Sequence, residues 1–202
     1  MDRRTILQAL IAGLAVESSK TLWGADKQEK ANKLGQKEGL LVTLGEDRNR
    51  TGPRQPPGHP FIVSGRDNGG ALAIAGPLVA PDQCQATSRK VGGGIPLHIH
   101  YEQDEYWYVI RGEHFVQIGD KKFYAKAGDL VFGPRGVPHS PRGLTENGAG
   151  LTMWQPAGTM EEFFHELDEA QRKAGGKLPP PDVLAALFKA HGMEIVGPPA
   201  EP

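Results

Sequence analysis

The sequence lacks the features that mark several large classes of protein. Its 202 residues contain a single cysteine, Cys84, which excludes an internal disulfide and a cluster of thiolate metal ligands. No apolar run approaches the ~18–20 residues that a membrane-spanning helix requires. Lysine and arginine (23) nearly balance aspartate and glutamate (24), so no excess of charge suggests that the chain binds nucleic acid.

Glycine and proline, in contrast, are abundant. The chain has 27 glycines and 17 prolines, and 38% of its residues are hydrophobic. Many tight turns and a modest apolar content are typical of all-β folds. The length allows one domain of roughly 100–150 residues with extensions at its ends, and the sequence contains no internal repeat that would indicate a second copy of the domain.

Three histidines and one glutamate form the strongest chemical signal. His98 and His100 are two residues apart, so on a strand both side chains lie on the same face. Glu105 begins the next apolar run, and His139 follows a turn rich in proline and glycine. If the strands curl into a barrel, these four side chains converge on a ligand set suited to one divalent metal ion. Fe, Mn, Ni, Co, Cu and Zn all accept imidazole and carboxylate ligands, and the set does not choose among them.

The spacing of these residues resembles the two motifs of the cupin superfamily. The first motif is Gly92-x5-His98-x-His100-x4-Glu105-x6-Gly112, and the second is Gly128-x5-Pro134-x-Gly136-x2-His139. Gly143 departs from the family, which usually has asparagine there, but that asparagine is not a metal ligand. Asp104 also fits the permitted spacing, whereas only Glu105 keeps six residues before Gly112. The resemblance implies an all-β fold, a single jelly-roll-like cupin β-barrel, which we place at residues 61–156.

The strand after Glu105 fixes which side chains face the interior of that barrel. Residues 106–111 are aromatic and β-branched, and an inward Glu105 places Trp107 inward by alternation. Residues 113–118 and 121–125 form a predicted hairpin across Gly119-Asp120. The same parity makes Trp107, Phe115 and Gln117 candidate pocket-lining residues, with core packing as the alternative for the aromatics. His114 is out of step with that face and is expected at the surface.

Residues 157–202 are predicted to form a short helical appendage. Thr159 and Glu162 have the spacing of a capping box, Gly175-Gly176 end the first helix, and residues 183–190 form a second. The closing residues 193–199 are expected to be an extended tail. This arrangement is similar to the C-terminal part of single-domain cupins that resemble quercetin 2,3-dioxygenase.

The N-terminal residues 1–25 allow two interpretations. Arg3-Arg4 followed by an apolar stretch resembles a twin-arginine export signal, which would make the protein periplasmic or otherwise exported. Alternatively, this stretch is an amphipathic arm that packs on the barrel or on a partner chain, and the protein is cytoplasmic. Residues 26–60 are polar and then rich in proline, and are expected to be a linker that wraps the barrel.

The resemblance also implies a function. A metal-dependent cupin of this type would be a dioxygenase that uses O2 on a small oxygenated aromatic or enol, with Glu105 accepting the substrate's proton as a general base. Two alternatives stay open, because this barrel hosts many activities: an O2-independent metal isomerase or lyase, and a non-catalytic small-molecule-binding barrel. The family further implies a homodimer.

Overall fold

The computed structural model describes residues 39–42, 61–76, 95–145 and 148–202. The predicted signal or arm at 1–25, most of the linker at 26–60 and Cys84 lie outside these ranges. The chain divides into two compact units. One unit consists of residues 40–65 and 70–202. Residues 66–69 belong to the other unit, although the short 3-10 helix η1 (Gly65–Asp67) begins one residue earlier. The strands and the two C-terminal helices all belong to the unit of residues 40–65 and 70–202. No helix among the described residues is long and apolar enough to cross a membrane.

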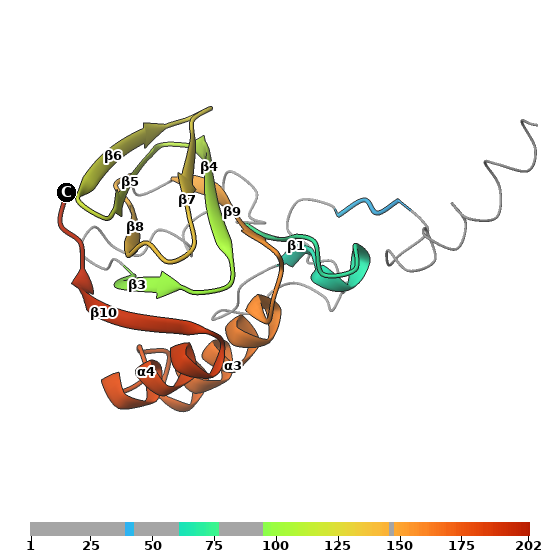
Figure 1. Cartoon of the computed structure of the whole chain (residues 1–202), viewed down its shortest axis with the longest axis vertical. Helices are drawn as coiled ribbons and strands as arrows, with labels where there is room; N and C mark the ends of the chain where they lie inside the picture. Colours follow the sequence, from blue (N-terminus) through green and yellow to red (C-terminus); the bar gives the residue numbers. More distant parts are fainter. Residues whose placement is uncertain (1–38, 43–60, 77–94, 146–147) are drawn as a thin grey trace, which may run out of the picture. The chain divides into compact units, whose positions relative to one another are not determined.

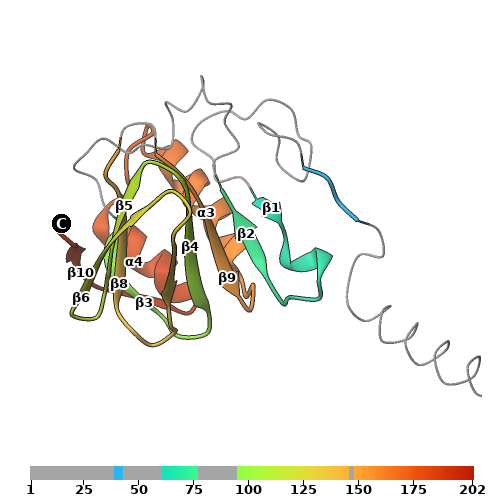
Figure 2. The ribbon, with the colours of Figure 1, turned by 90° about the horizontal axis from the view of Figure 1, so that it is seen from above.

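This unit contains two antiparallel five-stranded sheets (Figure 1), so the fold predicted as all-β is mostly β, with helices at its C-terminal end. The first sheet has the order β1 (Phe61–Val63), β2 (Ala73–Ala75), β9 (Ala149–Gln155), β4 (Asp104–Arg111), β7 (Leu130–Gly133). The second has the order β10 (Met193–Pro199), β3 (Pro96–His100), β8 (His139–Gly143), β5 (Glu113–Ile118), β6 (Lys121–Lys126). Figure 2 shows β1, β2 and β9 following one another along the first sheet.

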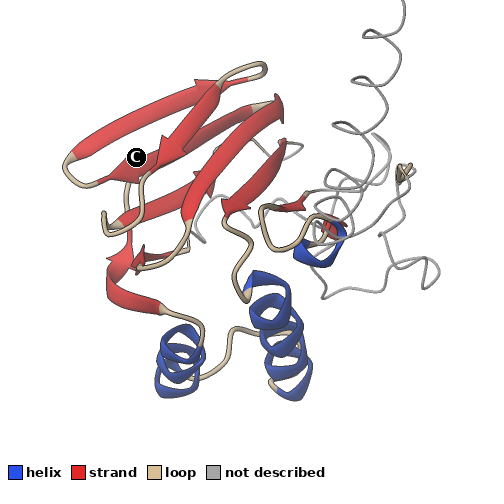
Figure 3. Ribbon diagram, turned by 45° about the vertical axis from the view of Figure 1, so that its right-hand side comes forward, coloured by secondary structure: helices blue, strands red, loops and turns tan. Residues whose placement is uncertain are grey.

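Two helices, α3 (Met160–Lys173) and α4 (Pro181–Ala190), form the predicted C-terminal appendage. The two helices lie side by side (Figure 3). The rings of Phe163 and Phe188 contact each other, with centroids 5.0 Å apart. Both rings belong to a buried apolar cluster that also includes Trp154 of β9. The helices therefore share one core with the first sheet.

The prediction of a capping box at the start of α3 is wrong, because the threonine side chain does not cap the helix. Thr159 is the N-cap residue, but its side chain makes no capping hydrogen bond. Its hydroxyl instead pairs with Nδ1 of His191, at 2.9 Å, while Nε2 of His191 lies 3.3 Å from a carboxylate oxygen of Glu166. His191 is the C-cap residue of α4. The Thr159 side chain therefore links α3 to α4 and does not cap the N-terminus of α3.

The closing residues, predicted to be an extended tail, form a strand that is part of a sheet. β10 pairs with β3, placing Met193 opposite His100 and Ile195 opposite His98. The strand that carries two of the predicted metal ligands is therefore paired on one side with the last strand of the chain.

Alternation along β4 agrees with the prediction. Glu105, Trp107 and Val109 are buried, whereas Tyr108 is 39% exposed. Trp107 and Val109 join Val116, Ala125 and Val131 in a second apolar cluster.

The inward face of β5 differs from the predicted one. Ile118 lies opposite His139 in the pairing of β5 with β8, and directly opposed residues of an antiparallel pair project to the same face. Val116 and His114 therefore face inward with His139, and Phe115 and Gln117 lie on the outer face. Phe115 is nevertheless fully buried, and its ring lies 5.4 Å from that of Tyr124. The alternation of inward and outward residues on β4 could not be extended to β5, because the chain passes from one sheet to the other at Gly112 (φ 77°).

The corrected face of β5 makes a prediction about stability. Val116→Ala should lower the free energy of unfolding by about 1–3 kcal/mol, because the lost methyl groups leave a cavity in a fully buried site. Gln117→Ala, one residue along and on the outer face, should cost less than about 1 kcal/mol. Urea denaturation of both variants checks this, and a larger loss for Gln117→Ala would contradict the assigned face.

Candidate metal centre

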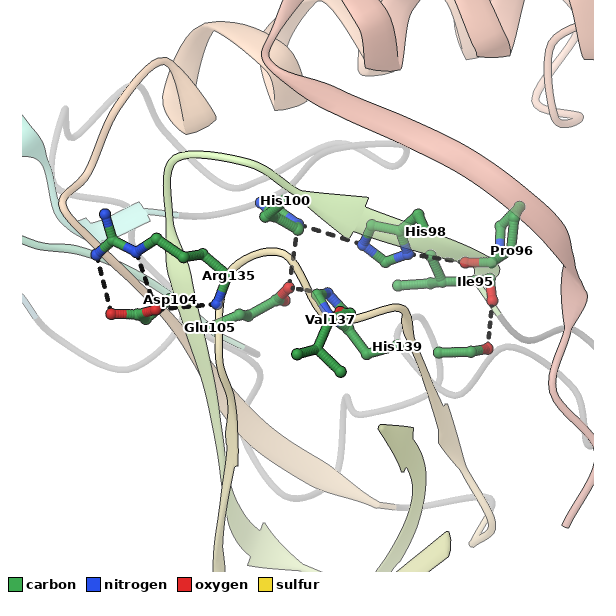
Figure 4. A network of polar contacts seen from close by, with 10 residues as sticks. Ile95, Pro96, His98, His100, Asp104, Glu105, Arg135, Val137 and His139 are labelled. Carbon is green, nitrogen blue, oxygen red and sulfur yellow. Dashed lines mark hydrogen bonds and ion pairs between the residues drawn. The ribbon is translucent and has the colours of Figure 1, made fainter. Parts of the chain in front are cut away.

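Four side chains from three strands meet at one point between the sheets. β3 supplies His98 and His100, β4 supplies Glu105, and β8 supplies His139. His98 and His139 lie directly opposite each other in the pairing of β3 with β8. Figure 4 shows the three rings and the carboxylate turned toward one another. We call these four residues the quartet.

The quartet is compact and closed to solvent. One ligand atom from each residue lies within 4.8 Å of the other three, and each residue is at most 4% exposed. Oε2 of Glu105 is 3.0 Å from Nε2 of His139 and 3.2 Å from Nε2 of His100. Nε2 of His98 is 3.2 Å from Nε2 of His100. Bonds of about 2.0–2.2 Å to a common ion would give separations of this order between neighbouring ligand atoms.

Hydrogen bonds to the backbone orient two of the imidazoles. Nδ1 of His98 lies 2.8 Å from the carbonyl oxygen of Pro96, and Nδ1 of His139 lies 3.0 Å from that of Val137. A carbonyl oxygen only accepts hydrogen bonds, so both Nδ1 atoms carry the hydrogen and, in a neutral ring, Nε2 carries a lone pair. Nε2 of His139 and Oε2 of Glu105 are then two acceptors 3.0 Å apart. A proton or a cation between them relieves that repulsion.

Burial and mutual contact shift the pKa values in the direction that a metal site needs. Desolvation by burial, with a further contribution from nearby His139, lowers the pKa of His98 to about 3, so its ring is neutral near pH 7. Burial alone raises the pKa of Glu105, but positive charge and N–H donors on His100 and His139 more than offset it and hold the pKa of this carboxyl well below its usual range. Neutral imidazole and ionised carboxylate are the forms that bind metal ions.

Of the two adjacent carboxylates, Glu105 lies in the quartet and Asp104 does not. Asp104 forms an ion pair with Arg135, whose Nη2 and Nε lie 2.9 and 3.1 Å from the carboxylate oxygens, and it also accepts the backbone N–H of Arg135 at 3.0 Å. The backbone N–H of Gly136 donates to the carbonyl oxygen of His100, at 2.7 Å. These bonds fix the turn that delivers His139 against the two strands that carry the other ligands.

Aromatic rings flank the quartet on two sides. The ring of Trp107 lies 5.3 Å from that of His139, and the ring of Phe188 lies 5.3 Å from that of His98. Trp107 has room because Gly133 has no Cβ: one built there would lie 2.8 Å from the indole. Trp107 is thus beside the candidate centre as well as in the core, while Phe115 and Gln117 lie on the outer face of β5.

The predicted surface position of His114 is wrong, because it faces inward on β5. Burial lowers its pKa, and its Nδ1 has no hydrogen-bond partner in the described part of the chain. His165, in contrast, is exposed on α3.

Two buried polar residues near the quartet were not singled out from the sequence. Gln103 is 1% exposed and directly precedes β4, and Trp154 is 2% exposed and lies opposite Glu105 in the pairing of β4 with β9. Gln103 continues the inward alternation of Glu105 and Trp107, which was a signal available in the sequence. The position of Trp154 depends on a strand register that no local pattern reports.

Comparison with known families agrees with this geometry. Residues 88–155 match the cupin domain family. All four residues of the quartet fall within the matched cupin segment, and the match supports the cupin superfamily, as the two motifs predicted. The resemblance to quercetin 2,3-dioxygenase stays a prediction.

Similar proteins share only part of the chain. An uncharacterized protein of Methanocaldococcus jannaschii is 35% identical over 49 residues, which are 24% of this chain and 39% of that protein. The KdgF structure from Halomonas sp. is 17% identical, with a TM-score of 0.38, over 51% of this chain and 84% of that one. A cupin-2 domain protein of Shewanella frigidimarina is 20% identical, with a TM-score of 0.36, over 51% and 83%.

The ion pair beside the quartet should contribute to stability in a pH-dependent way. The Arg135 guanidinium lowers the pKa of Asp104, so the folded value lies below the unfolded one. The contribution is then present above the unfolded pKa, about 4, and is lost as pH falls through the folded pKa. A double-mutant cycle with Asp104→Asn and Arg135→Leu should give a small favourable coupling energy at pH 7, because the pair is partly exposed. Urea denaturation of the four proteins at pH 7 and at pH 3 measures it, and a coupling energy that grows on acidification would contradict the pairing.

Proposed function

We propose that the quartet binds one divalent first-row metal ion and that the protein is a metal-dependent dioxygenase for a small oxygenated aromatic or enol. The observation that carries the metal site is the approach of Nε2 of His139 to Oε2 of Glu105, at 3.0 Å in a buried position. Both atoms are acceptors when the imidazole is neutral. Desolvation makes such a contact costly unless a positive charge or a proton lies between the two atoms. The donor set of three imidazoles and one carboxylate supplies the ligands for that charge.

The surroundings of the quartet favour an aromatic substrate. Trp107 and Phe188 present ring edges or faces to the histidines, and the nearby charges of Asp104 and Arg135 are paired with each other. An apolar, aromatic setting suits a flat, oxygenated ring better than a strongly charged sugar acid. The geometry is the same for a metal isomerase, so O2 consumption is the measurement that separates the two.

Each residue of the quartet has a part in this proposal. A bound divalent ion would act as a Lewis acid that favours ionisation of a substrate hydroxyl. The carbonyls of Pro96 and Val137 hold His98 and His139 with Nε2 turned inward. Oε2 of Glu105, already shared between His100 and His139, is the atom placed to accept the hydroxyl proton. The aromatic rings exclude water.

Elemental analysis of the purified protein tests the metal site. We expect about one equivalent of Fe, Mn, Ni, Co, Cu or Zn per chain, and its loss in the double variant His98→Ala/His139→Ala, because two of four ligands are then missing. His165→Ala, on the exposed face of α3, is the matched control and should retain the metal. Absence of metal from the wild-type protein, with a melting temperature that a chelator does not change, would rule out the proposed centre.

Oxygen uptake by the metal-loaded protein tests the reaction. Consumption of O2 with quercetin or catechol, at least tenfold lower in Glu105→Gln, would support the dioxygenase. A loaded protein that consumes no O2 with any flavonol or catechol would contradict the dioxygenase and leave the metal site standing.

A further inference from the structure

Two residues beside Glu105, one along the chain and one across the pairing of β4 with β9, carry buried polar atoms that are unpaired among the described residues. Neither Oε1 of Gln103 nor Nε1 of Trp154 has a hydrogen-bond partner in the part of the chain that the structure describes. Gln103 is 1% and Trp154 is 2% exposed. One atom is an acceptor and the other is a donor. Buried polar atoms nearly always have a hydrogen-bond partner, so an unpaired buried atom requires an explanation. One explanation is a ligand that supplies the missing partner when it binds.

Both residues share the inward face of the first sheet with Glu105. Trp154 lies opposite Glu105 in the pairing of β4 with β9, which puts their Cβ atoms about 4.5–5.5 Å apart. Gln103 comes two residues before Glu105, and burial alternates along 103, 105 and 107. That spacing along an extended chain is on the order of 6.6 Å. These separations between residue positions are of the order of one aromatic ring, so a ligand held at Glu105 is within reach of both side chains.

Packing holds the two side chains in place. Gly158 has φ 54°, and a Cβ built there would lie 2.1 Å from Nε2 of Gln103, so the amide occupies the space that a side chain at 158 would take. The Trp154 ring contacts Phe61 and Phe164, with centroids 6.1 and 5.2 Å away. Groups that are fixed before a ligand arrives lose little freedom when they bind it.

We propose that Gln103 and Trp154 form a polar subsite beside the quartet, which selects substrates with two neighbouring oxygens, one a hydroxyl. Oε1 of Gln103 accepts the hydrogen bond of the hydroxyl, and Nε1–H of Trp154 donates to the second oxygen. Catechols, enediols and α-hydroxy ketones have this pair, and monophenols do not. The inference rests on the proposed metal centre and deepens it, since it names the chemical feature that the centre recognises.

A competing role for Gln103 involves His100 alone. Nδ1 of His100 is also buried without a partner among the described residues, and it is three positions away in the chain. If Gln103 served only to orient His100, its loss would weaken metal binding and leave the choice of ligand unchanged. The experiment therefore measures the affinity for the metal ion and the affinity for the organic ligand.

The test uses Co(II)-loaded protein without oxygen and 4-nitrocatechol, whose visible absorption changes on ionisation, with 4-nitrophenol as the ligand that lacks the second oxygen. Trp154→Phe and Gln103→Leu should each raise the Kd for 4-nitrocatechol about tenfold, the size expected for one lost hydrogen bond. 4-Nitrophenol has only one of the two neighbouring oxygens, so its Kd should rise in at most one of the two variants. The Co(II) affinity should change by less than about twofold, and the melting temperature by no more than about a few degrees. Tyr106→Phe and Gln155→Leu, outward-facing neighbours of the same strands, are the matched controls and should bind as wild type.

Each other outcome overturns a defined claim. A wild-type protein that takes up no Co(II) removes the metal centre and the subsite together. Co(II) bound normally, with 4-nitrocatechol bound equally by wild type and both variants or not bound at all, removes the subsite alone. Weaker Co(II) binding in Gln103→Leu, with unchanged selectivity between the two ligands, assigns Gln103 to His100 instead. If Gln103→Leu does not fold, Gln103→Met, which keeps the side-chain length, replaces it.

Discussion

The candidate centre depends on the antiparallel pairing of strands from two facing sheets. In one sheet, the pairing of β3 with β8 sets His98 opposite His139, and in the other, β4 turns Glu105 toward them. The N–H of Gly136 bonds to the carbonyl of His100, which ties the second motif to the first. Backbone hydrogen bonds therefore hold four polar side chains closer together than these groups would remain in water. The pairing of the strands stabilises the fold enough to offset the unfavourable burial of these four side chains.

The same burial that makes the quartet costly gives it its chemical character. Desolvation keeps His98 neutral, and the surrounding imidazoles keep Glu105 ionised. Trp107 and Phe188 remove water from two sides, which strengthens every electrostatic interaction inside. α4 and β10, which come from the end of the chain, are part of this enclosure, because Phe188 contacts His98 and β10 pairs with β3. The C-terminal appendage is thus part of the site.

Sequence patterns predicted correctly which side chains face inward when the strand contained a residue whose direction was already fixed. On β4 the inward Glu105 fixes the parity of Trp107, and the structure agrees. On β5 no residue is constrained in this way, and both Phe115 and Val116 are apolar, so the pattern does not show which one faces inward. Only the pairing with β8, where Ile118 meets His139, decides it. Thr159 shows the same limit: its spacing to Glu162 is that of a capping box, but His191, 32 residues later, is the partner of its hydroxyl.

The sequence by itself determined the largely β class, because alternation along strands and proline- or glycine-rich turns are local properties. Its resemblance to the two cupin motifs, also a matter of local spacing, implied the four candidate ligands and the choice of Glu105 over Asp104. The tertiary structure alone decided which residues surround those ligands. Trp154 is beside Glu105 through a cross-strand register, Phe188 is beside His98 through helix packing, and Gln103 is held in place through a glycine 55 positions away. These contacts join segments that are far apart in the chain, and no local pattern encodes them.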